Sequence, residues 1–122
     1  QCLLDRDQAA TPIQQQEALD KASRGPLLLL AVANYKDSNE DISKQEKLIS
    51  LGCAIQNILL SAYAFGFGSG ISSGRALQSD RVRSLFKLTN DEEPICFITI
   101  GTVLKNKPGR IRPNLSEYYS VF

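Results

Sequence analysis

The sequence predicts one domain in which helices and buried strands are combined. Two observations predict it: capping boxes that open at Thr11 and Ser43 precede helical apolar patterns, and two unbroken apolar runs, 27–32 and 94–100, have the length of strands. The length of 122 residues suits one domain with a single core. We therefore expect one domain over 1–122.

The first helix is expected over residues 11–22. Thr11 is placed to cap it, Pro12 lies in the first turn where proline is tolerated, and Gln14 can complete the capping box. Its apolar side chains make only a thin stripe, so we expect this helix on the surface. The run 27–32 that follows is typical of a strand covered on both faces.

The long second helix is expected to begin after Ser43, with Glu46 completing its capping box, and to end near Gly66. The stretch 48–74 holds no charged residue, which is long enough to consider a membrane span. Polar side chains interrupt it, so we favour a helix buried on nearly all sides in protein, with the membrane span as the alternative. Its small residues would let another backbone approach closely, as in a central core helix or a dimer seam.

A short helix and a second strand are expected after the glycine-rich segment. Ser79 can cap a helix over 81–87, and residues 91–93 are expected to form a polar turn before the strand 94–100. The side chains of the short helix expected to face inward are Val82, Leu85 and Phe86.

Composition excludes several kinds of chemistry. The chain contains no His, so it supplies no Ser-His-Asp or Cys-His triad, no histidine ligand for zinc and no histidine base. Its 3 Cys residues are far apart without a CxxC pair, so we expect neither a disulfide framework nor a metal site. Cys53 and Cys96 lie in apolar patterns and are expected in the core.

Charge and the start of the chain bear on partners and location. The formal charge of +1 does not indicate nucleic-acid binding, and we expect no nucleic-acid or membrane partner. No signal peptide is recognisable, so a reducing, cytoplasmic location is expected. The chain begins at Gln1 and contains no Met, which suggests a processed product or a piece of a longer protein.

The segment GFGSGISSG offers backbone rather than side chains. A dinucleotide fingerprint should follow a strand, whereas this segment follows a helix and holds Ser73 where the last glycine belongs. A P-loop fails too, because Gly74 is followed by Arg75 and not by Lys. Two interpretations remain: main-chain N–H groups presented to a flat or anionic ligand, or a tight helix-to-strand connection that needs glycine.

The segment 102–122 is expected to be an extended C-terminal tail. At the other end of the chain, residues 1–25 are expected to form an N-terminal helical segment. Four cations lie within 8 residues of the tail, and Arg110 and Arg112 alternate around Ile111. In an extended chain both guanidinium groups point to one side, which suits a phosphate. The alternative is a solvated cationic loop. No residue of the chain resembles a general acid or base, so enzymatic chemistry would belong to a cofactor.

The order of these features resembles one family. The string SLGCAIQNILLSAYAFGFG at 50–68 is the most specific part, followed by Ser73-Gly74, FITIGT at 97–102 and the closing segment 119–122. The chain resembles the flavin-dependent nitroreductases, and within them the short bacterial type that reduces small electrophiles with NAD(P)H.

This resemblance implies an α+β fold with a mixed sheet wrapped by helices, and a homodimer built around the long central helix. It implies one FMN per site at the subunit interface, with backbone N–H groups after that helix against the flavin N5 and O4 edge, where they stabilise negative charge. Two tail arginines match the positions that hold the FMN phosphate. The implied FMN-binding residues are Ile71, Ser72, Ser73, Gly74, Arg110 and Arg112.

The end of the long helix corresponds to a segment assigned to NAD(P) contact in close relatives. These residues are Ser61, Ala62, Tyr63, Ala64, Phe65 and Gly66. Close relatives carry a large aromatic residue and an Arg where this chain has Ile71 and Ser72, so its flavin face is smaller and less cationic. The Arg-rich helix start of the family is absent, so we expect the C-terminal portion of a nitroreductase, with the N-terminal part of the fold missing.

The leading hypothesis is an FMN-dependent NAD(P)H oxidoreductase that reduces nitroaromatic, quinone or similar small electrophilic acceptors by ping-pong hydride transfer. No side chain is expected to be catalytic, because FMN carries the chemistry. The alternative is a non-catalytic flavin-binding or dimerising remnant that lacks the N-terminal phosphate-binding motif.

Overall fold

A three-stranded sheet forms the centre of the fold. The computed structural model describes residues 3–4, 7–23, 25–36, 42–105, 108–109 and 111–121. Strands β1 (Leu27–Asn34), β2 (Gly68–Ser72) and β3 (Glu92–Gly101) lie in the order β1-β3-β2. Both pairings are antiparallel, so the parallel pairing of a mixed sheet does not occur within the described residues.

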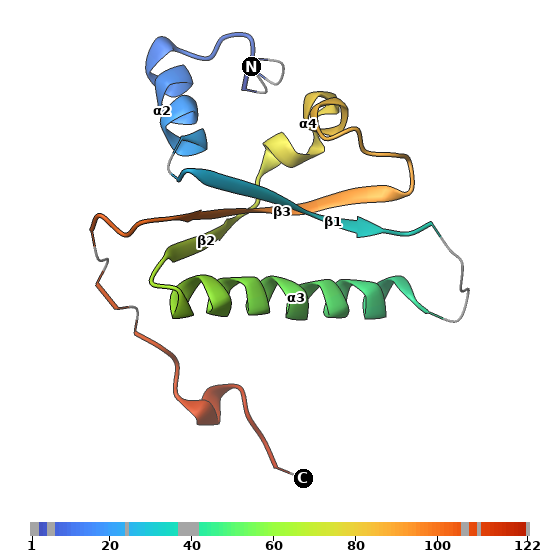
Figure 1. Cartoon of the computed structure of the whole chain (residues 1–122), viewed down its shortest axis with the longest axis vertical. Helices are drawn as coiled ribbons and strands as arrows, with labels where there is room; N and C mark the ends of the chain where they lie inside the picture. The colour runs from blue at the N-terminus through green and yellow to red at the C-terminus, as the bar shows by residue number, and fades with distance from the viewer. Residues whose placement is uncertain are drawn as a thin grey trace.

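Helices lie on both faces of this sheet, as Figure 1 shows. The long helix α3 (Lys44–Ala64) runs along one face, and the short helix α4 (Asp80–Leu85) lies on the other with the 3₁₀ turn η1 (Arg75–Gln78). Helix α2 (Pro12–Ala22) precedes β1. Helices and strands at the predicted places confirm the α+β class.

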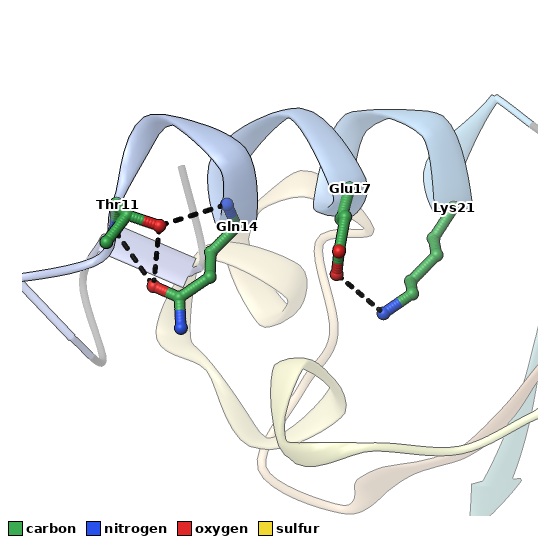
Figure 2. A network of polar contacts seen from close by, with 4 residues as sticks. All are labelled: Thr11, Gln14, Glu17 and Lys21. Atoms are coloured by element: carbon green, nitrogen blue, oxygen red, sulfur yellow. Dashed lines mark hydrogen bonds and ion pairs between the residues drawn. The ribbon is translucent and has the colours of Figure 1, made fainter.

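Both predicted capping boxes are present. In α2 the Gln14 amide donates to the Thr11 hydroxyl at 3.3 Å, and the Thr11 amide donates to the Gln14 side chain at 2.8 Å (Figure 2). In α3 the same exchange joins Ser43 and Glu46 at 3.2 and 2.8 Å. Each box satisfies two backbone donors that the first turn leaves without helical partners. The exposed Glu17–Lys21 pair at 3.9 Å in Figure 2 adds little.

The core lies between α3 and the sheet. Ala31, Ile55, Cys96 and Ile98 form a buried cluster, with Ile98 only 1% exposed. Cys96 and Ile98 share a face because side chains alternate along a strand. Burial of Cys96 confirms the predicted core position and raises the pKa of its thiol, which disfavours the reactive thiolate.

Three expectations about burial are wrong for the chain described here. Among the described residues of α3 only Ile55 and Ala62 are buried, and Cys53 is exposed, because one face of the helix meets the sheet and no described element covers the other. The start of β1 is also exposed at Leu27 and Leu28, so this strand is not covered on both faces. Helix α3 is long and apolar enough to cross a membrane, but the core helices of soluble proteins also meet this criterion.

The second half of the chain departs from expectation at two places. Val82 is buried and Phe86 lies with its ring centroid 6.4 Å from that of Phe97, but Leu85 is 75% exposed. Val82 and Phe86 are four residues apart, and Phe86 is still 38% exposed. Leu85 is only three residues from Val82, so its exposure does not follow from helical spacing; no described element covers it. The acidic residues 92–93, expected in a turn, belong to β3 and pair with the end of β1.

The Ser43 cap should contribute measurably to stability. We expect Ser43→Ala to lower the free energy of unfolding by about 1 kcal/mol at neutral pH, because a first-turn donor loses its partner. Ser43→Asn keeps a capping oxygen and should behave as the wild type. Urea unfolding followed by circular dichroism measures the difference, and an equal loss in both variants would contradict it.

The same cap predicts a pH dependence. Hydrogen bonds from the Ser43 hydroxyl and amide lower the pKa of Glu46 below its ordinary value of 4.5. A carboxyl whose pKa is lower in the folded state stabilises the fold above its unfolded pKa, and this contribution is lost as pH falls through the folded pKa. The stability gap between wild type and Ser43→Ala should therefore narrow on acidification, and a widening gap would refute the assignment.

Candidate functional site

The segment 66–74 turns the chain from α3 into β2. Gly66 has φ +80°, and its amide donates to the Tyr63 carbonyl at 2.9 Å while the Phe67 amide donates to the Ala62 carbonyl at 2.9 Å. These bonds satisfy carbonyls at the end of the helix, and the left-handed conformation favours glycine. Residues 66–67 therefore form a tight helix-to-strand connection, which was one of the two interpretations of the glycine pattern. Strand β2 follows directly.

The predicted flavin-edge residues lie at the far end of β2. Ile71 pairs with Ile98 and so shares the sheet face that α3 covers, yet it remains half exposed at the free edge of the sheet. Ser72, Ser73 and Gly74 are all exposed. We call residues 71–74 the β2 loop from here on.

Backbone donors are available in the β2 loop. The described hydrogen bonds outside helices and strands include none donated by the amides of Ser73 or Gly74. A Cβ built on Gly74 would meet nothing within 4 Å, so the space above this backbone is open. The loop can therefore present two neighbouring N–H groups to a flat or anionic ligand, as the second interpretation of the glycine pattern requires.

The described residues of the tail lie away from the β2 loop within one chain (Figure 1). Its described residues leave the end of β3 and pass the C-terminal end of α3, whereas the β2 loop leads toward η1 on the other side of the sheet (Figure 1). Arg112 is exposed and forms no ion pair with a described residue. Arg110 lies outside the described residues. Exposure and the lack of an ion pair with a described residue thus leave the Arg112 guanidinium available, while the described part of the tail runs apart from residues 71–74.

The six residues predicted to contact NAD(P) divide between two surroundings. Ser61, Ala62 and Phe65 line a cavity of about 600 Å³ between α3 and the ends of β1 and β3, whereas Tyr63 points away and is 80% exposed. Ala64 and Gly66 do not line the cavity either. The residues that line it are Pro26, Leu27, Asn57, Ile58, Ser61, Ala62, Phe65, Phe67, Ile100, Gly101 and Thr102.

Sequence reasoning missed most of this cavity. Asn57, Ser61 and Phe65 recur every four residues, a spacing that could have grouped them on one helix face. No local signal places the starts and ends of distant strands against that face. Within the described residues, His, Cys, Asp and Glu side chains form no group of three or more that could hold a metal ion.

Gly66 is the one described glycine of this segment with a positive φ, so its replacement should cost stability. We expect Gly66→Ala to lower the free energy of unfolding by about 1 kcal/mol, because a side chain disfavours positive φ. Gly70 has no positive φ, and a Cβ there would meet nothing within 4 Å, so Gly70→Ala should be neutral or slightly stabilising. Urea midpoints compare the two variants, and equal losses would contradict the role given to Gly66.

Known proteins resemble the chain in both sequence and fold. The model of the Nitroreductase family matches residues 2–102. The Escherichia coli K12 protein named "Putative NAD(P)H nitroreductase YdjA" is 32% identical over 90 residues, which are 70% of this chain and 49% of that protein. Protein DrgA of Synechocystis sp. PCC 6803 is 32% identical over 87 residues, 71% of this chain and 40% of DrgA. The chain therefore spans about half or less of the length of these relatives.

Solved structures give the same fold. A nitroreductase-like family protein from Bacillus cereus has a TM-score of 0.73 at 20% identity, covering 93% of this chain and 62% of that one. An FMN-dependent nitroreductase from Clostridium difficile R20291 has a TM-score of 0.59 at 20% identity, covering 79% and 57%. The family match over most of the chain and the shared fold lead to one conclusion: the chain belongs to the nitroreductase family.

Proposed function

We propose that this chain forms the flavin-edge part of an FMN-dependent NAD(P)H oxidoreductase. The observation that carries the proposal is the exposed β2 loop at the end of β2, whose Ser73 and Gly74 amides donate none of the described hydrogen bonds outside helices and strands. The names of relatives support it, since one names NAD(P)H and another names FMN. The acceptors we propose are nitroaromatics, quinones or similar small electrophiles.

The residues of the β2 loop suit the edge of a flavin ring. Ile71 offers an apolar surface on the α3 side of the sheet, and the amides of Ser73 and Gly74 offer donors beside it. Such preorganised donors stabilise negative charge without reorganising when it develops. Bound FMN supplies the hydride chemistry itself, taken from NAD(P)H and passed to the acceptor in a ping-pong sequence. The chain's own contribution is to bind, orient and polarise.

The phosphate end of the cofactor is assigned to Arg112, together with Arg110 two residues before it in the sequence. A guanidinium binds phosphate with paired N–H donors, and Arg112 has no competing ion-pair partner among the described residues. Because the described part of the tail and the β2 loop lie apart in one chain (Figure 1), we propose that the site is completed where two copies meet.

The uncovered face of α3 supports a homodimer. Ile49, Cys53 and Leu60 recur at helical spacing and are exposed, and Gly52 beside them has open space above its backbone. A long apolar helix face of this kind is costly to leave in water. We propose that a second copy packs on it and that the enzyme works in the cytoplasm without a membrane or nucleic-acid partner.

Removing Arg112 should weaken FMN binding by about 1 to 3 kcal/mol, the scale of a hydrogen bond to a charged group. Lys105 is an exposed cation of the same tail that the proposal leaves out, so Lys105→Ala should bind FMN nearly as the wild type. Quenching of FMN fluorescence on titration with each variant gives the affinities. An equal loss of FMN affinity in both variants would mean that the tail acts only as a general cationic surface. No loss of affinity in Arg112→Ala would mean that Arg112 does not contact the phosphate.

Turnover separates this proposal from its rival, a non-catalytic flavin-binding or dimerising remnant. The proposal expects the FMN-loaded chain to oxidise NADH or NADPH faster when a nitroaromatic acceptor is added. Flavin binding without acceptor-dependent oxidation by either nucleotide would favour the remnant.

A charge on the uncovered face of α3 should prevent dimerisation. Leu60→Asp places a carboxylate in the proposed seam, where it would be buried without a partner. Leu85→Asp puts the same charge on exposed α4 and should leave the assembly unchanged. Sedimentation velocity measures the mass of each variant. A dimer that survives Leu60→Asp would contradict the proposed seam.

A further inference from the structure

The cavity at the C-terminal end of α3 has a chemistry of its own. Its walls come from the start of β1, the last third of α3 and the end of β3, which meet at one end of the molecule (Figure 1). Two aromatic side chains, Phe65 and Phe67, line it together with aliphatic ones such as Ile58 and Ile100. A volume of about 600 Å³ lies within the range of small-molecule sites.

No charged side chain lines this cavity among the described residues. Its polar side chains are neutral, from Asn57, Ser61 and Thr102. The cavity also lies at the C-terminal end of a helix of 21 residues, where the aligned peptide dipoles amount to a partial negative charge. Both features disfavour an anion, and the pyrophosphate of NAD(P) is an anion.

The residues predicted to contact NAD(P), 61–66, do not lie on one face of the structure. Ser61, Ala62 and Phe65 line the cavity, whereas Tyr63 and Ala64 lie on other faces of the helix, as successive residues of a helix must. One extended ligand cannot contact all of them from one side. The residues present therefore do not fit the dinucleotide, although three of them form a site for something else.

We propose that this cavity binds an uncharged, planar, ring-containing molecule, and that residues 61–66 do not hold NAD(P). Rings prefer offset or edge-to-face packing against aromatic walls, which Phe65 and Phe67 supply. Asn57, Ser61 and Thr102 offer neutral hydrogen-bonding groups that orient a polar substituent. The cavity and the β2 loop lie at opposite ends of β2, so this site is separate from the proposed flavin edge and does not require FMN.

The test uses an uncharged planar dye, Nile red, with the chain free of FMN. Phe65→Ser and Tyr63→Ser remove equally exposed aromatic rings, 78% and 80%, from the same end of α3, and only Phe65 lines the cavity. We expect Phe65→Ser to weaken dye binding about tenfold, the scale of one lost ring contact. Tyr63→Ser should change it by less than about twofold. Leu60→Ser serves as a control for dye on the outer face of the helix.

Two further measurements make the outcome decisive. Ser61→Phe fills the cavity from an exposed position and should abolish dye binding while leaving FMN affinity unchanged, which keeps this inference distinct from the proposed function. NADPH added to the dye complex should displace no dye. Displacement by NADPH, equal losses in Phe65→Ser and Tyr63→Ser, absence of dye binding, or binding that disappears as the chain dimerises would each overturn the proposal.

Discussion

The packing of α3 along one face of the sheet is the constraint on which the rest of the structure depends. Ile55, near the middle of the helix, meets Ala31, Cys96 and Ile98, so one contact joins the helix to both long strands. The helix also runs in a defined direction relative to β1. The N-terminal half of α3 lies against the end of β1 at residues 32–34, and its C-terminal end lies against the start of β1. Every candidate site is positioned by this register.

The two ends of β2 acquire different chemistry from this arrangement. At its start, the chain has just left the C-terminal end of α3, where carbonyl groups and apolar side chains gather around the cavity. At its end, the β2 loop presents backbone amides on an exposed edge. The proposed flavin, which gains negative charge on reduction, would suit the donor end, and the uncharged ring proposed for the cavity would suit the other. Only residues 68–70 of the strand separate these two surfaces of opposite character.

Local features of the fold could be predicted from the sequence, because each rests on neighbours in the chain. The capping residues Thr11, Ser43 and Ser79 fixed the helix starts, and the apolar runs fixed β1 and β3. Burial could not be predicted equally well, as Cys53 and Leu85 show, because exposure depends on which distant element covers a face. For the same reason the tight connection at Gly66 could be predicted from a continuous glycine pattern, whereas the cavity, assembled from three separated segments, could not. The flavin, phosphate and NAD(P) assignments came from the family resemblance and stay predictions.

The central claim is that the β2 loop holds the edge of FMN, and amide NMR on titration with FMN tests it most directly. The account predicts that the amide resonances of Ser73 and Gly74 shift and become protected from hydrogen exchange, while those of Gly68 and Phe67 at the other end of β2 change little. Perturbations centred on the cavity residues, or none at Ser73 and Gly74 despite saturating FMN, would contradict it.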